Sequence, residues 1–547
     1  MTRWVCCLLW LACGAAAVGA QESALERFER LRGAGQGEAA AAELAGWVDD
    51  NPKDTPAAMA LGRHYSETGR VGRALKVWRR ALEEGGDEAA FAGVANQLVG
   101  SGETAAAIEV LELGRRRLND GRLFSLQIAE LHLRRQALPP AVREYLAYLD
   151  LQPHRLGQVV HRLRATAGKG AQVDGLLNAL DAAYRQRDDR NSAVLYAYVS
   201  VAAGRPERGL DALRAGLKQP EIAEALFQFA ARSEAEKHIR VAATAYGLFV
   251  DAVPQSPYRH QALLRQGELE ARLGGASAAS AVYRRLAAEA PQRPEAVEAL
   301  LELAGLTLAQ RGDLAAVRQA LEQVLKVRPR GISADRARLL LCETALRQGD
   351  LDEAAGHLEY VASQAHAAEA LFRQAEVDFF AGAYDDARQG LEAFAEQEAR
   401  DARGNDALDL LLLLEEHADA EEALQAYADA RLATRRGAAD AGAAWQRLKA
   451  VAPAKLSQRA AWERARLAEE AGAPNALELY GDLGGDYAVE GHMGQARLFE
   501  ERGDLDRALK AYETALLNFA DDPRGPLVRL HILRLRPLVP DSEEASP

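Results

Sequence analysis

A small residue returns along almost the whole chain at a nearly constant interval, and this spacing limits what the sequence can fold into. Starting at Ala74 and ending at Ala508, it recurs after 33, 34, 68, 33, 37, 38, 37, 33, 54, 35 and 32 residues. The intermediate positions are Ala107, Ala141, Gly209, Ala242, Ala279, Val317, Ala354, Ala387, Ala441 and Ala476. Apolar residues follow these positions at steps of three and four, which places them on one face of an α-helix. The pattern predicts repeated units of two helices.

Two intervals depart from the common value in ways that the same unit explains. The interval of 68 residues is twice 34, so a degenerate repeat is expected at 155–187. The interval of 54 residues exceeds one repeat by about 20 residues, and the leucine-rich segment 405–417 is expected to supply an extra helix there. Clear repeats are predicted at 56–153, 190–396 and 420–523.

Residues at other fixed places in the unit strengthen this interpretation. Turn glycines are expected at Gly69, Gly102, Gly204, Gly274, Gly312, Gly349, Gly382, Gly472 and Gly503, and closing prolines at Pro52, Pro153, Pro254, Pro291, Pro329 and Pro453. Aspartates after three of these glycines are expected to cap the next helix, namely Asp313, Asp350 and Asp504. Large aromatic residues stand four positions after the small residue, at Trp78, Tyr145, Tyr246, Tyr283, Tyr480 and Tyr512. We expect these rings to fill the space between neighbouring repeats.

This combination of small, glycine, aromatic and proline positions resembles the tetratricopeptide repeat, whose unit has 34 residues. The resemblance extends over 21–534 and implies an all-α fold, a right-handed α-α superhelix of about 13 helix pairs. It also implies a groove that binds other proteins. The segment Ser256 to Pro291 is loosely similar to exported bacterial tetratricopeptide repeat proteins of the cell envelope.

Composition and charge narrow the possible functions further. The chain is 48% hydrophobic but only 6% aromatic, which is not the composition of a β protein. It carries 80 acidic and 67 basic residues, a formal net charge of −13, so it lacks the large basic surface that a phosphate backbone requires. Nucleic acid is therefore not an expected partner.

The first 20 residues have the pattern of an export signal. A positive charge at Arg3 precedes a short apolar run, and small residues stand before Gln21. The protein is therefore expected to be exported to the periplasm. Residues 535–547, at the other end of the chain, are expected to form a disordered tail.

The cysteines bear on the same export prediction. Cys6, Cys7 and Cys13 lie within the signal, which leaves Cys342 alone in the mature chain and excludes an intramolecular disulfide. Cys13 has small neighbours, so a lipidated Cys13 that anchors the protein at the outer membrane is the alternative to simple cleavage. Trp10 and Leu11 depart from the lipobox that this alternative requires.

No motif for catalysis, cofactors or metals stands out. His154 and His161 have no carboxylate or cysteine at ligand spacing and are interpreted as surface histidines. Cys342 occupies the small position of a first helix, where a buried structural thiol is expected. We therefore predict that the protein is not an enzyme and that it has neither a cofactor nor a metal site.

The residue after the small position of each first helix samples the expected groove. These residues are Arg63, Asn96, Glu130, Tyr198, Glu268, Leu306, Glu343, Glu376, Arg466 and Arg497. The centre of this series is acidic and its ends are basic. We hypothesise that the centre binds an extended protein segment of basic character, with a groove charged only for solubility as the alternative.

Three classes of function remain open from the sequence. The first is a non-catalytic protein-binding scaffold in the bacterial cell envelope. The second is an accessory subunit of polysaccharide or protein secretion or of outer-membrane assembly. The third is a helical enzyme, which hydrolytic activity of the purified chain would reveal.

Overall fold

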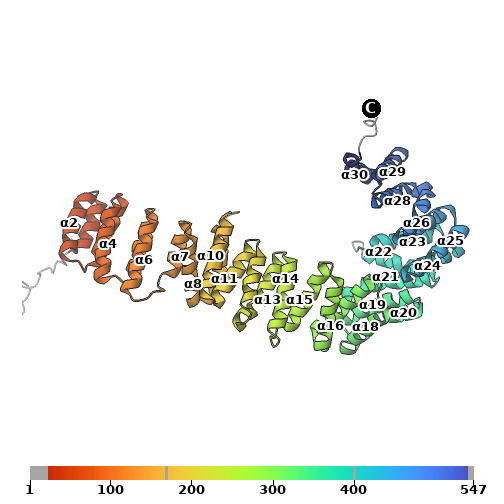
Figure 1. Ribbon diagram of the computed structural model, residues 1–547, viewed down its shortest axis with the longest axis horizontal. Helices are drawn as coiled ribbons and strands as arrows, with labels where there is room; N and C mark the ends of the chain where they lie inside the picture. The colour runs from red at the N-terminus through yellow and green to blue at the C-terminus, as the bar shows by residue number, and fades with distance from the viewer. Residues whose placement is uncertain (1–21, 167–170, 398–401, 540–547) are drawn as a thin grey trace, which may run out of the picture. The chain divides into compact units, whose positions relative to one another are not determined.

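The computed structural model of the protein describes residues 22–166, 171–397 and 402–539. These residues form α-helices and short 3₁₀ helices, without a β-strand among them. Successive helices are joined by short connections and stack side by side (Figure 1). The all-α helical solenoid predicted from the repeat spacing is therefore confirmed. The predicted signal, residues 1–20, lies outside the described residues.

The chain divides into two compact units, 1–262 and 263–547. The helices of the first unit are α1 (Ala24–Gly33), α2 (Gly37–Asp50), α3 (Thr55–Glu67), α4 (Val71–Gly85), α5 (Glu88–Gly100), α6 (Thr104–Arg117), α7 (Ser125–Arg134), α8 (Leu138–Leu151), η1 (Pro153–Arg155), α9 (Leu156–Thr166), α10 (Ala171–Arg187), α11 (Arg190–Ala202), α12 (Pro206–Ala215), α13 (Pro220–Ala235) and α14 (Ile239–Ala252). Helices α1 and α2 pack together ahead of the first predicted clear repeat. Helices α9 and α10 occupy the segment of the predicted degenerate repeat.

Helix α15 (Arg259–Arg272) spans the boundary between the units in the sequence. The helices that follow are α16 (Ala276–Glu289), α17 (Pro294–Ala309), α18 (Leu314–Val327), α19 (Ile332–Gln348), α20 (Leu351–Leu358), α21 (Gln364–Phe380), α22 (Tyr384–Gln397), α23 (Gly404–Glu416), α24 (Glu421–Arg436), α25 (Ala441–Val451), α26 (Ala454–Glu470), α27 (Ala476–Gly481), η2 (Gly485–Tyr487), α28 (Ala488–Glu501), α29 (Leu505–Asn518), α30 (Gly525–Leu535) and η3 (Arg536–Leu538). The first residues of the predicted tail thus form η3, and residues 540–547 lie outside the described part.

Small residues allow the helices of a pair to approach closely. Ala74, Ala279 and Ala508 are fully buried, as the spacing predicts. The buried ring of Trp78 lies directly over Gly62 of its own pair, so a Cβ at that glycine would clash with the indole. Tyr283 lies in the same way over the glycine sixteen residues before it, whereas Tyr480 packs against a glycine of the next pair. Packing inside the pair was not part of the sequence prediction.

The turns follow the predicted glycine positions with one exception. The backbone has a positive φ at Gly69, Gly102, Gly204, Gly274, Gly349, Gly382, Gly472 and Gly503. The prediction for Gly312 was wrong, because Arg311 takes the left-handed conformation there, with φ 51°. Helix α17 ends at Ala309, which places the turn one residue earlier than the glycine. The three predicted aspartate caps are present and accept hydrogen bonds from backbone amides two or three residues on.

Helix α24 departs from simple pairing of neighbours. It packs with α25 and also contacts α19 and α21, which lie well before it in the sequence. Helix α23, close to the predicted extra helix 405–417, packs on α22 and provides the intervening chain. As a result, side chains of α24 reach residues of two earlier repeats within the second unit.

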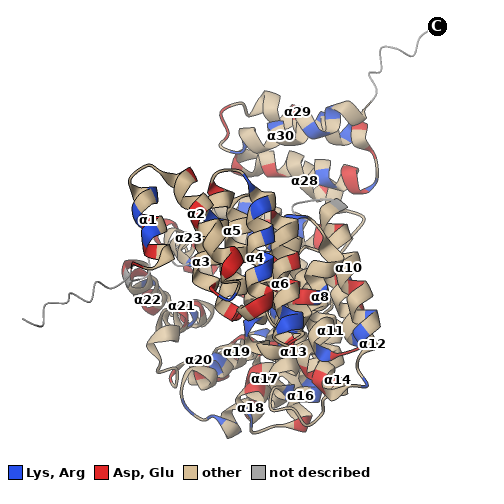
Figure 2. Ribbon diagram, turned by 90° about the vertical axis from the view of Figure 1, so that its left-hand side faces the viewer, with Lys and Arg blue, Asp and Glu red and all other residues tan. Residues whose placement is uncertain are grey.

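Charged residues of both signs are distributed over the helices rather than collected on one of them (Figure 2). In the part of the chain that the structure describes, no helix combines the length and the apolar character that a membrane span requires.

Candidate interaction surface

The residues expected to line the groove lie on the first helices of successive pairs. Arg63, Asn96, Glu130 and Tyr198 belong to α3, α5, α7 and α11, and Glu268, Leu306, Glu343, Glu376, Arg466 and Arg497 belong to α15, α17, α19, α21, α26 and α28. Their surroundings differ widely, so they do not form one uniformly charged surface.

In the first unit, these residues range from exposed to buried. Arg63 and Asn96 are exposed. Glu130 forms an ion pair with Arg162. Tyr198 is buried, and the guanidinium of Arg232 lies 4.7 Å from the centre of its ring, close enough for a cation–π contact. Arg63 and Asn96 are therefore the residues of this group that a partner reaches most directly.

The basic residues at the far end of the series are paired with carboxylates. Arg466 contacts Glu463 at 3.0 Å and Glu470 at 2.9 Å. Arg497 contacts Glu469 at 2.9 Å. The predicted basic end is therefore neutralised in part by acidic neighbours on α26.

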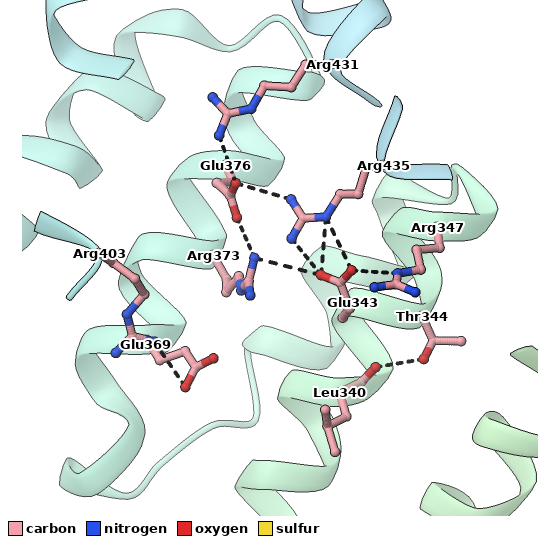
Figure 3. A network of polar contacts seen from close by, with 10 residues as sticks. All are labelled: Leu340, Glu343, Thr344, Arg347, Glu369, Arg373, Glu376, Arg403, Arg431 and Arg435. Carbon is pink, nitrogen blue, oxygen red and sulfur yellow. Dashed lines mark hydrogen bonds and ion pairs between the residues drawn. The ribbon is translucent and has the colours of Figure 1, made fainter. Parts of the chain in front are cut away.

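The two central glutamates, Glu343 and Glu376, lie in a network of arginines that α19, α21 and α24 build together (Figure 3). Glu376 accepts hydrogen bonds from Arg373 at 2.7 Å and from Arg435 at 3.1 Å. Arg431 approaches the same carboxylate at 3.5 Å. We call Glu343, Glu376, Arg347, Arg373, Arg431 and Arg435 the Arg–Glu network.

Glu343 forms the second centre of the Arg–Glu network. Arg435 donates to its Oε2 atom at 2.6 Å, and Arg347 donates to its Oε1 atom at 2.8 Å. Arg435 thereby bridges two carboxylates that lie 92 and 59 residues before it. The predicted acidic centre is thus not an open acidic surface, because both carboxylates already face guanidinium groups of the same chain.

The charges of the network determine the ionisation of these glutamates. Burial by itself raises the pKa of Glu376, but the nearby charges of Arg435, Arg373 and Arg431 outweigh burial and hold the pKa below its ordinary value. The same balance of burial against Arg435 and Arg373 lowers the pKa of Glu343. Both carboxylates are therefore ionised at neutral pH.

Sequence reasoning missed the arginines of the network. Arg347 follows Glu343 by four residues and Arg373 precedes Glu376 by three, so these two contacts could have been read from helical spacing. Arg431 and Arg435 share one face of α24, but nothing in the local sequence indicates that α24 packs on α19 and α21. Their contribution required the tertiary structure.

Groups suited to catalysis were also sought. The described ranges contain no grouping of three or more His, Cys, Asp or Glu side chains able to hold a metal ion. Burial raises the pKa of the Cys342 thiol to about 12, so it remains protonated at neutral pH and is a poor nucleophile. An open pocket of about 700 Å³ at the end of α24 is lined mainly by alanine and glycine, with Arg311 and Arg464 among its polar residues.

These features define the class of the protein as an all-α repeat protein in which helix pairs stack through small side chains. No protein-family model and no curated protein matches the chain. Among solved structures, it is similar to a tetratricopeptide repeat protein from Parabacteroides merdae, with 11% identity, 57% of this chain and 98% of that chain covered, and a TM-score of 0.31. It is also similar to the tetratricopeptide repeat domain of P58(IPK), with 19% identity, 67% and 99% covered, and a TM-score of 0.23. Yeast Tom70 is a third, with 11% identity, 90% and 100% covered, and a TM-score of 0.26. The family named from the sequence pattern thus recurs among these structures.

Proposed function

We propose that the protein is a non-catalytic scaffold of the bacterial cell envelope that binds other proteins along its stacked helix pairs. The observation that carries this proposal is the repetition of one packing arrangement from α3 to α29, seen at Ala74, Ala279 and Ala508. Such repetition presents one residue position again and again on successive helices. A surface of this kind suits an extended protein partner better than a small substrate.

Residues 1–20 support the envelope location in this proposal. Their charge and apolar pattern is that of an export signal, and Cys13 offers a site for lipidation. Fractionation of cells that express the full chain or a chain lacking residues 2–20 tests export. We expect the full chain outside the cytoplasm and the shortened chain inside it. Labelling with a fatty acid analogue, with Cys13→Ser as the control, tests the lipid anchor separately.

Affinity purification tests the scaffold function. The tagged mature chain is purified from the envelope of its own host after mild cross-linking, and mass spectrometry identifies the proteins that accompany it. Each candidate is then tagged in turn, because a genuine partner must also capture this chain. Recovery of an outer-membrane pore would assign the accessory role in secretion. The proposal fails if reciprocal capture recovers no protein, or if the purified chain hydrolyses envelope polymers.

A further inference from the structure

The Arg–Glu network carries more positive than negative charge. Arg347, Arg373, Arg431 and Arg435 contribute four positive charges, because a guanidinium remains protonated in proteins. The two ionised glutamates contribute two negative charges. Four minus two leaves a local surplus of two positive charges.

This surplus is unusual for the chain, whose formal net charge is −13. Other partly buried charge clusters have the opposite balance. Arg336 stands between two glutamates of α17, and Arg187 stands between two aspartates. Each of those clusters carries a surplus of one negative charge. The network on α19, α21 and α24 therefore differs in sign from comparable clusters elsewhere in the protein.

The surplus lies where a partner can reach it. The Arg373 side chain is 24% exposed and the Arg431 side chain is 29% exposed, so both are half-buried rather than enclosed. Arg431 makes one polar contact among the described residues, the 3.5 Å approach to Glu376. Its remaining N–H groups are free to bind an acceptor, since a guanidinium has five donors.

Partly desolvated charge without compensation is unfavourable, and a carboxylate matches the guanidinium fork. We propose that the Arg–Glu network binds an acidic segment of a partner protein, whose side-chain carboxylates neutralise the two surplus charges through Arg373 and Arg431. This inference rests on the proposed scaffold function. It replaces the basic partner expected from the sequence, because the arginines reverse the sign of the predicted acidic centre. The acidic chain as a whole disfavours nucleic acid at this place.

A labelled peptide with alternating glutamate and alanine tests the inference, with glutamine and lysine versions of the same peptide as controls. Fluorescence anisotropy with the full mature chain, at low salt and at about 0.15 M salt, measures the affinity. We expect the glutamate peptide to bind, more weakly as salt rises, and the two controls not to bind. Binding of the lysine peptide would overturn the inference. Complete displacement of the glutamate peptide by equimolar inorganic phosphate would also overturn it, because the site would then take a small anion.

Three variants connect binding to the network. Arg431→Glu lowers the local surplus from two to zero and should weaken binding at least about tenfold. Arg529→Glu makes the same change of total charge on α30, at an exposed arginine, and should leave the affinity unchanged. Glu376→Gln raises the surplus to three and should strengthen binding, a gain that loss of folding does not produce. Equal affinity of wild type, Arg431→Glu and Glu376→Gln would refute the site.

The same variants separate this inference from the scaffold function. Envelope partners that are captured equally by wild type and by Arg431→Glu would leave the scaffold in place and refute this site. If the glutamate peptide binds as expected but reciprocal capture recovers no partner, the site stands and the scaffold function fails.

Discussion

Replacing Arg435 with methionine removes the guanidinium that donates hydrogen bonds to both carboxylates of the Arg–Glu network, while keeping a long aliphatic side chain. The lost contacts are 2.6 Å to Glu343 and 3.1 Å to Glu376. A hydrogen bond to a charged group contributes about 1.5–3 kcal/mol, so the two contacts together set an upper range of about 3–6 kcal/mol.

Two features of the network reduce this cost. Each carboxylate keeps another arginine at hydrogen-bond distance, Arg347 at 2.8 Å for Glu343 and Arg373 at 2.7 Å for Glu376, so neither is left unpaired. The substitution also lowers the repulsion among the four guanidiniums. We therefore expect Arg435→Met to lower the free energy of opening α24 by about 2–3 kcal/mol.

Arg431→Met is the matched control, since Arg431 lies one turn away on the same helix. It loses one contact of 3.5 Å on a side chain that is 29% exposed, so we expect a cost of no more than about 0.5 kcal/mol. A long helical stack need not unfold in one step, so hydrogen exchange of the α24 amides is the appropriate measurement. Equal effects of the two substitutions, or a cost below about 0.5 kcal/mol for Arg435→Met, would refute this account of how α24 is held.

Further substitutions test the packing and the ionisation. Gly267→Ala places a methyl group inside a buried tyrosine ring of α16 and should lower the free energy of unfolding by about 1–3 kcal/mol. Gly305→Ala, at the same position of the next repeat, meets open space and should raise it by up to about 1 kcal/mol; equal urea midpoints would contradict both expectations. Tyr145→Phe should be neutral or stabilising by thermal denaturation, because this buried hydroxyl has no hydrogen-bond partner among the described residues, whereas Tyr512→Phe should cost about 1 kcal/mol, because its hydroxyl donates to a glutamate at 3.0 Å. A lowered pKa stabilises the folded state above the ordinary value of 4.5 and ceases to do so as pH falls through the folded value, so Glu376→Gln should make acid unfolding less steep below pH 4.5; an unchanged acid profile would show that Glu376 does not drive it.

The repeat architecture was predictable because its determinants are local. The cap at Asp350 and the left-handed turn at Gly349 each depend on a few adjacent residues, and the burial of Ala354 follows from helical spacing. Each copy of the unit adds independent support for the same register. The turn at Arg311 escaped prediction because a nearby glycine at 312 satisfied the pattern one residue late.

The candidate site was predictable in position but not in charge. Glu343 and Glu376 were identified as central residues from their place after the small position of each first helix. Their nearest arginines on the same helices, Arg347 and Arg373, follow from helical spacing. Arg435 does not, because its contacts span 92 and 59 residues and depend on where α24 packs.

The sequence by itself determined that this protein is a stack of helix pairs, since small side chains at a fixed interval permit no other close packing over so many copies. Only the tertiary structure decided which charge the central surface presents. Electrostatic interaction depends on distance in space, and the packing of α24 on α19 and α21 adds guanidinium groups that the order of residues along the chain does not reveal.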